Sequence, residues 1–119
     1  DAVAQSGAKR VMQDPSRLQI LAEWTASDHM WTRRAALVFA LPFTKARHPN
    51  ATEAMARQSI LGWCETLAPE RDWFIQKAIA WWLRELSKRE PDAVTAWLAT
   101  HGATLKPFAR KDAARQLGR

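Results

Sequence analysis

The stretch RDWFIQKAIAWWLRELSKR, residues 71–89, decides the fold class because it has the pattern of one long amphipathic helix. Its apolar residues recur at steps of three and four, the spacing that brings side chains onto one face of an α-helix. The predicted core face consists of Ile75, Ala78, Ile79, Trp82 and Leu86. A second face, turned away from the core, carries Lys77, Trp81, Arg84 and Lys88 at i, i+4, i+7 and i+11.

The rest of the chain has the same helical spacing between its six prolines, and no stretch has the alternation typical of a strand. We therefore predict an all-α protein of seven helices, the first of them near residues 3–12. The third helix is predicted to turn Trp31, Ala35, Val38 and Phe39 inward. The fourth is predicted to bury Ile60, Leu61, Cys64 and Leu67, and the sixth Val94, Trp97 and Leu98.

Capping residues and prolines predict where these helices begin and end. A side chain that accepts a hydrogen bond from the first free amides favours a helix start, and proline favours the first helical position. The predicted starts are Asp14-Pro15, Ser27 or Asp28, Asn50 or Thr52, Pro91 and Pro107. Gly102 suits the left-handed position that follows the sixth helix.

Two segments of the chain resemble each other at an offset of 43 residues: WTRRAA at 31–36 and FIQKAI at 74–79. A weaker echo, FARK, occupies residues 108–111. The offset lies within the roughly 40 to 47 residues of HEAT and armadillo units, whose helix pairs stack into a solenoid with a concave binding face. We predict HEAT-like helical repeats that form an α-α superhelix with a basic concave face, as a single domain over residues 1–119. A plain helical bundle is the alternative.

The composition favours a compact domain with an anionic partner. Of the 119 residues, 47% are hydrophobic and 25% charged, which excludes a disordered chain. Eighteen Lys and Arg against twelve Asp and Glu leave a net charge of +6, and seven tryptophans accompany this excess. Positive charge of this size makes nucleic acid the first candidate partner.

The absence of certain residues and motifs from the sequence leads to predictions about the cellular compartment and the need for a cofactor. A single cysteine, Cys64, cannot form an internal disulfide, and no apolar run approaches the roughly 20 residues that span a bilayer. We therefore expect a cytoplasmic protein without a membrane partner. His29, His48 and His101 have no metal-ligand spacing, and we expect neither a metal nor a cofactor. Phosphate-loop, serine-hydrolase and zinc-protease motifs are also absent.

The basic face of residues 71–89 is the strongest functional signal in the spacing. Lys and Arg neutralise phosphates, and a tryptophan among them can pack against a sugar or a base. The alternative is a solvated face whose lysines pair with Glu85 or Asp92, with Trp81 half-buried against a neighbouring helix. Trp31 and Arg34 form a smaller pair of the same kind, in which Arg34 binds phosphate or forms an ordinary salt bridge. The predicted DNA-binding residues are Arg33, Arg34, Lys77, Trp81, Arg84 and Lys88.

Three segments of the chain resemble the AlkD-like family of DNA alkylation repair enzymes. They are WTASDHMWTRRAA at 24–36, FIQKAIAWWLRE at 74–85 and LKPFARKDA at 105–113. The family consists of alkylpurine DNA glycosylases built from HEAT-like repeats. The resemblance implies a basic channel that holds double-stranded DNA containing alkylated purines and removes bases alkylated at N3 or N7. It also implies that no metal or organic cofactor takes part.

The resemblance also assigns roles to individual residues. Arg34 matches the family's active-site arginine, which contacts the DNA backbone, and Trp81 matches its second active-site tryptophan, beside the sugar. Asp1 aligns with the catalytic aspartate, although an aspartate at this place also suits a helix N-cap. The family's first active-site tryptophan precedes this aspartate, so we expect the chain to be the C-terminal portion of a longer one.

Two other functions remain as alternatives to the glycosylase. Some members of the family lack part of the active site and bind DNA structures without catalysis. The first alternative is therefore a non-catalytic HEAT-like module that binds DNA or an acidic protein surface. The second is a plain helical interaction domain with no role in nucleic-acid binding.

Overall fold

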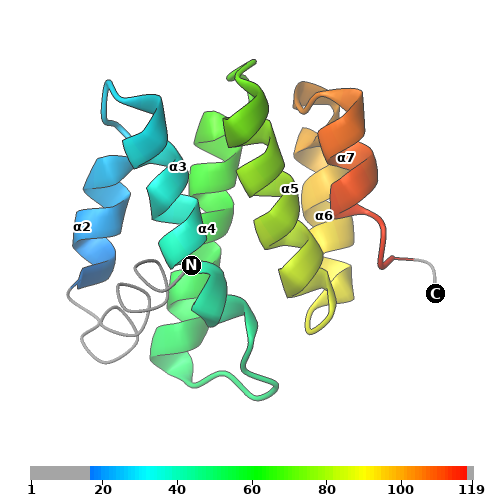
Figure 1. Ribbon diagram of the computed structural model, residues 1–119. Coiled ribbons are helices and arrows are strands. Elements are labelled where there is room, and N and C mark those ends of the chain that lie inside the picture. The colour runs from blue at the N-terminus through cyan, green and yellow to red at the C-terminus, as the bar shows by residue number, and fades with distance from the viewer. Residues whose placement is uncertain (1–16, 118–119) are drawn as a thin grey trace.

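The computed structural model describes residues 17–117, which form helices joined by short connections (Figure 1). The α-helices are α2 (Arg17–Trp24), α3 (Met30–Phe39), α4 (Ala51–Leu67), α5 (Trp73–Ser87), α6 (Pro91–His101) and α7 (Pro107–Ala113). Two 3₁₀ turns, η1 (Leu41–Thr44) and η2 (Gly102–Thr104), follow α3 and α6. No strand occurs in this range, so the all-α prediction is confirmed for it. The helix predicted near residues 3–12 lies outside the described residues.

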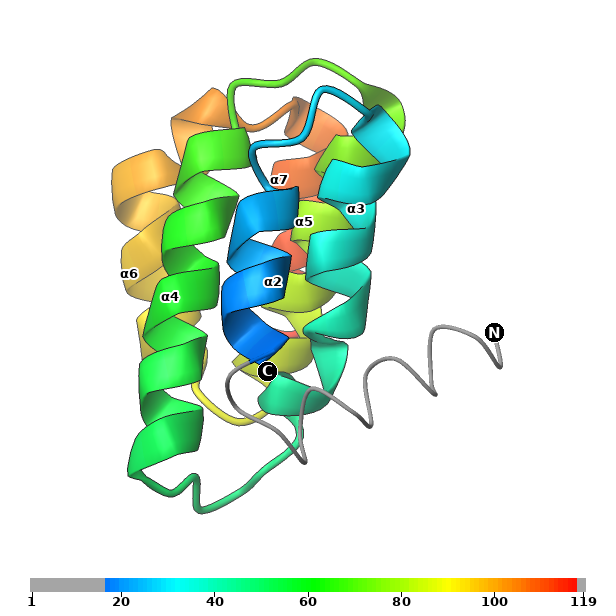
Figure 2. The ribbon, with the colours of Figure 1, turned by 90° about the vertical axis from the view of Figure 1, so that its left-hand side faces the viewer.

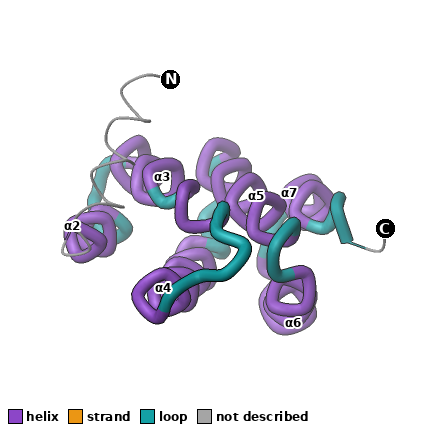
Figure 3. The backbone as a smooth tube through the Cα atoms, turned by 90° about the horizontal axis from the view of Figure 1, so that it is seen from below, coloured by secondary structure: helices purple, strands orange, loops and turns teal. Residues whose placement is uncertain are grey.

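The helices alternate between two layers. Viewed along the helices, α3, α5 and α7 form one row and α2, α4 and α6 the other (Figure 3). A view turned by 90° shows the same separation (Figure 2). Helix α5 packs most extensively against α7, then α3, and it also contacts α4 and α6. The stretch that decides the fold is therefore the central helix of its layer.

Helix α5 begins and packs largely as its sequence predicts. Asp72 caps its start, where the carboxylate accepts hydrogen bonds from the backbone N–H groups of Phe74 (2.8 Å) and Ile75 (3.4 Å). All five residues of the predicted core face are buried. Trp82 is fully buried, and its indole N–H donates to the carbonyl of Ala40 at 3.1 Å, so its one polar atom is paired.

The predicted helix ends are partly correct. Asn50, one of the two predicted caps, begins α4, and Pro91 is the first residue of α6, as predicted. Glu53 completes a reciprocal capping box with Asn50. Helix α3 begins after His29 instead of Ser27 or Asp28, and Ser27 accepts a hydrogen bond from the His29 amide. Gly102 is right-handed, with φ of −59°, because the chain continues directly into η2.

The predicted core face of α3 is partly wrong: Phe39 packs against the core and Ala35 and Val38 are half-buried, but Trp31 is not inward. Ala36 and Leu37 are the buried residues of this helix, whereas Trp31 is 57% exposed. Trp31 lies in the first turn of α3, where its ring contacts Phe74 at the start of α5, with 4.7 Å between centroids. Its neighbour is thus another exposed ring at the edge of the layer, and helical spacing alone could not distinguish this edge from the core.

One buried arginine holds the connection between η1 and α4 in place. Arg57 on α4 is 2% exposed, and its guanidinium donates to the carbonyls of Phe43 and Ala46, each at 2.7 Å. The same group pairs with Glu90, at 2.5 Å, just before α6. These bonds pair two backbone carbonyls that accept no hydrogen bond within an α-helix. They also pair the charge of Arg57, which explains why the core tolerates it.

We predict that Arg57→Met lowers the free energy of unfolding by about 2–4 kcal/mol, because it leaves two carbonyls and a carboxylate without their partner. Urea denaturation followed by tryptophan fluorescence measures the change. The neighbouring exposed residue serves as a control, and we expect Gln58→Met to stay within about 0.5 kcal/mol of the parent. An Arg57→Met variant as stable as the parent would contradict this role.

None of the helices in residues 17–117 has both the length and the apolar character needed to cross a membrane.

Candidate functional site

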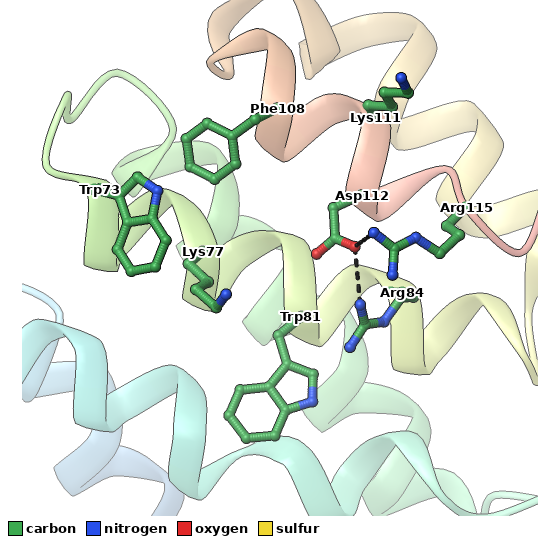
Figure 4. A pocket seen from close by; sticks show the side chains of 8 residues that line it. All are labelled: Trp73, Lys77, Trp81, Arg84, Phe108, Lys111, Asp112 and Arg115. Carbon is green, nitrogen blue, oxygen red and sulfur yellow. Dashed lines mark hydrogen bonds and ion pairs between the residues drawn. The ribbon is translucent and has the colours of Figure 1, made fainter.

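A groove of about 760 Å³ lies along α5 and α7 on the outer face of their layer (Figure 4). Both helices contribute long aromatic or charged side chains to it. The lining residues are Trp73, Lys77, Trp81, Arg84, Phe108, Lys111, Asp112 and Arg115. Three of the predicted site residues, Lys77, Trp81 and Arg84, are therefore brought together on one surface.

The packing of α7 on α5 explains why the groove forms here. Ala109 and Ala113 of α7 are completely buried, and side chains this small allow the two helices to approach closely. Burial of this alanine face leaves Phe108 and Lys111 exposed beside α5. The groove thus forms between the exposed faces of two helices whose other faces are in the core.

The groove carries four cations and one carboxylate, a net charge of +3. The carboxylate of Asp112 accepts a hydrogen bond from Arg84 at 2.8 Å and contacts Arg115 at 3.1 Å. The Lys77 ammonium lies over the ring of Trp73, 4.8 Å from its centroid. Lys77 and Lys111 form no ion pair with any side chain of residues 17–117. Positive charge therefore remains for an anionic ligand.

A row of exposed aromatic rings crosses the first turns of α3, α5 and α7. Trp31 contacts Phe74 with 4.7 Å between centroids, and Trp73 lies 5.1 Å from Phe74. Trp73 stacks on Phe108 at 6.1 Å and an interplanar angle of 23°. The row joins α3 to the groove, so aromatic surface is continuous over all three helices of the layer.

Arg34 extends this surface onto α3. Its guanidinium carbon lies 5.8 Å from the centroid of Trp31, which places a cation over an exposed ring at the edge of the row. The three pairs Trp31 and Arg34, Phe74 and Lys77, and Phe108 and Lys111 have the same three-residue spacing near the starts of α3, α5 and α7. The segments that resemble each other in sequence thus repeat the same surface elements.

Two other predicted residues are engaged in ion pairs outside the groove. Arg33 contacts Glu70 at 2.9 Å and donates to the carbonyl of Ser27 at 2.8 Å, which ties α3 to the connection before α5. Lys88 is exposed and pairs with Glu85 at 2.6 Å. The pairing of Lys88 matches the solvated-face alternative for that end of the stripe.

Some site residues lie beyond what the sequence predicted or what the structure describes. Asp1 is outside the described residues. The α7 residues of the groove were not predicted, although the echo at residues 108–111 was a signal that pointed to Phe108 and Lys111. Asp112 and Arg115 had no such signal, because only the tertiary packing of α7 brings them to Arg84.

The one cysteine of the chain is not placed for nucleophilic chemistry. Cys64 is fully buried, and burial raises the pKa of its thiol well above the usual value, which disfavours the nucleophilic thiolate. Between residues 17 and 117, no three His, Cys, Asp or Glu side chains are grouped so that they could hold a metal ion. Cations beside exposed rings, the pattern that remains, suit a polyanion that also presents sugars or bases.

Comparison with known protein families gives a match over nearly the whole chain. A family model described as DNA alkylation repair enzyme matches residues 1–117. The match includes all three helices of the groove layer and the residues before α2. No curated protein matches the chain.

We predict a pH-dependent contribution of Glu85 to stability. The hydrogen-bonding ammonium of Lys88 lowers the pKa of the Glu85 carboxyl; burial opposes this effect, and Lys45 adds to it. A carboxyl with a lowered folded-state pKa stabilises the fold above its unfolded-state pKa and loses this effect as the pH falls through the folded-state value. Glu85→Gln should therefore lower the free energy of unfolding at neutral pH, by less than about 1 kcal/mol, because the side chains of its partners Lys88 and Lys45 are 50% and 62% exposed and water screens the ion pairs.

Urea denaturation across the pH range tests this expectation. The difference between Glu85→Gln and the parent should shrink to nothing in acid. Glu23→Gln, at an exposed position on α2, is the control for loss of a carboxylate. A difference that persists unchanged below the folded-state pKa would contradict the ionic origin of the effect.

Proposed function

Because the chain belongs to the DNA alkylation repair enzyme family, we propose that it acts in DNA repair as a glycosylase. Its reaction is hydrolysis of the N-glycosidic bond of purines alkylated at N3 or N7 in duplex DNA. The observation that carries this proposal is the groove of net charge +3 beside a continuous row of exposed aromatic rings. In this proposal the two layers are part of a HEAT-like superhelix, and the α3–α5–α7 layer is its basic concave face.

Binding follows from the charges of that layer. Lys77 and Lys111 bind backbone phosphates, since their ammonium groups are exposed and form no ion pair within the described part of the chain. Arg34 binds a further phosphate through its guanidinium fork. The aromatic row packs against sugars exposed along the DNA backbone. These contacts position a duplex without reading its sequence.

The chemistry uses the charge that the lesion already carries. Alkylation at N3 or N7 makes the purine cationic, so the base leaves readily with the electron pair of the C1′–N bond and becomes neutral. The sugar develops oxocarbenium character, which the carboxylate of Asp1 stabilises while Trp81 packs beside the deoxyribose. Water adds to C1′ and transfers a proton to Asp1. The products are a free alkylpurine and an abasic site.

Two further parts of the proposal concern cofactor and compartment. The reaction needs no metal or organic cofactor, because the leaving group is activated by its own charge. The protein acts in the cytoplasm, which the single buried thiol of Cys64 supports. A non-catalytic DNA-binding module is the alternative. The binding experiment below tests both functions, and the base-release experiment separates the module from the enzyme.

We predict salt-dependent binding to duplex DNA through the groove layer. The logarithm of the binding constant should fall linearly with the logarithm of salt concentration, with a slope of about −0.9 for each neutralised phosphate. Arg34→Ala and Lys77→Ala should each weaken binding several-fold and reduce the slope by about 1. Fluorescence anisotropy with a labelled duplex measures both quantities.

A matched charge change outside the layer is the control. Arg47 is exposed in the connection between η1 and α4, and Arg47→Ala should leave the affinity within about twofold of the parent. Binding that does not depend on salt, or no binding at all, would contradict every DNA-binding function for this chain.

We also predict release of 7-methylguanine from a methylated duplex by the protein that contains this chain. Asp1→Asn should abolish release without weakening DNA binding, because it removes the charge that stabilises the oxocarbenium ion and keeps the size of the side chain. Mass spectrometry of the released bases measures the reaction. Tight binding with no release by the parent would contradict the glycosylase and favour the non-catalytic module.

A further inference from the structure

Asp112 is the one acidic residue among the eight that line the groove, and two arginines converge on it (Figure 4). Its Oδ1 atom accepts a hydrogen bond from Nη1 of Arg84 at 2.8 Å. The same oxygen contacts Nη2 of Arg115 at 3.1 Å. One carboxylate oxygen is thus shared by guanidinium groups from α5 and from the turn after α7.

The helix that carries Asp112 does not itself favour a carboxylate at this position. Asp112 lies in the last turn of α7, where the helix dipole favours cations, and Arg110 and Lys111 already occupy that turn. Its stabilising contacts therefore come from the groove arginines, Arg84 and Arg115, and the residue is best explained by what it does there.

A guanidinium group binds a carboxylate and a phosphate with the same hydrogen-bond geometry. Two guanidinium groups that converge on one oxygen form a site that suits a single anionic oxygen of a phosphodiester. We propose that Asp112 occupies, in the free protein, the place of a DNA backbone phosphate between Arg84 and Arg115, and that DNA binding exchanges it for that phosphate. This inference rests on the proposed DNA-binding function and adds a regulating residue to it.

The exchange has two consequences for the binding of undamaged DNA. A phosphate that enters this position must replace an existing ion pair, so Arg84 contributes less to affinity than an arginine without a partner would. The displaced carboxylate then stays close to the phosphate and repels it, since the side chains of Arg84 and Asp112 are only 27% and 21% exposed and water screens them incompletely. Asp112 therefore lowers the affinity of the protein for undamaged duplex DNA. In the free protein it also holds the side chains of Arg84 and Arg115 in place.

A purely structural role for Asp112 predicts the opposite effect of its removal. If the Arg84 pair only fastens α7 to α5, Asp112→Asn loosens α7, lowers the melting temperature and weakens any ligand that needs the groove. If Asp112 competes with phosphate, the same substitution strengthens DNA binding. The direction of the change in affinity thus separates the two roles.

The first experiment compares the affinities of the parent, Asp112→Asn and Asp92→Asn for an undamaged duplex by fluorescence anisotropy at fixed salt. Asp92 is exposed in the first turn of α6, in the other layer, so Asp92→Asn makes the same charge change away from the groove. We expect Asp112→Asn to bind roughly 3- to 10-fold more tightly and Asp92→Asn to change affinity less than about twofold.

The second experiment is a double-mutant cycle between Arg84 and Asp112. Arg84→Ala should weaken binding several-fold in the Asp112→Asn background, where Arg84 is available to phosphate. With Asp112 present, Arg84→Ala should lower the DNA affinity less than about twofold. The variant loses the contact with phosphate, but the phosphate no longer has to break the ion pair between Arg84 and Asp112. A role confined to fastening α7 predicts the reverse: Arg84→Ala then weakens binding more with Asp112 present, because only in that background does it break the ion pair.

If Asp112→Asn does not fold, the affinity of Arg84→Ala with Asp112 present still tests the exchange of Asp112 for a phosphate. In that case Arg84→Ala must cost less affinity than Lys77→Ala, and an equal or larger cost overturns the exchange. A folded Asp112→Asn variant that binds DNA no more tightly than the parent also overturns it and leaves the proposed function standing. If the parent itself shows no salt-dependent DNA binding, the proposed function and the exchange both fail.

Discussion

Burial of one face of α5 is the constraint on which the rest of the structure depends. The fully buried Trp82 and Ile79 hold this helix at the centre of its layer, with α3 on one side and α7 on the other. Once that face is inside, the helical repeat compels Lys77, Trp81 and Arg84 to lie on the outer surface. The same helix thus contributes to both the core and the groove, and a substitution that rotated it would disturb both.

The outer surface of α5 and α7 brings several positive charges together. Neighbouring side chains reduce the repulsion between these charges. Lys77 lies against the face of Trp73, and Arg84 is paired with Asp112, so two cations have local partners when no ligand is bound. The ions are partly exposed, so hydration limits the cost of their mutual repulsion. A groove whose cations are partly paired and which still has a net charge of +3 is suited to a polyanion that binds and dissociates.

Helical periodicity correctly predicted five core residues of α5, although the buried face is wider than predicted and includes Gln76, Ala80, Leu83 and Ser87. Local capping chemistry predicted Asn50 or Thr52 at the start of α4, and Asn50 is the cap. The features that the sequence did not predict correctly depend on contacts between distant parts of the chain. Trp31 has core-like spacing on α3 but lies at the edge of its layer, and the buried Arg57 depends on carbonyls that only the folded chain brings together. Asp112 joins the site because α7 packs on α5, a contact that its own segment does not encode. The proposed role of Asp1 rests on the family resemblance alone.

The central claim, that the α3–α5–α7 layer binds DNA, is tested most directly by the indole N–H signals of the seven tryptophans in an NMR titration with a short duplex. The signals of Trp73 and Trp81, which line the groove, should shift as DNA is added. Those of Trp82 and Trp97 should not, because both are buried and donate to the carbonyls of Ala40 and Leu61 at 3.1 Å. Shifts confined to Trp63 on α4, or unchanged Trp73 and Trp81 signals at saturating DNA, would contradict the claim.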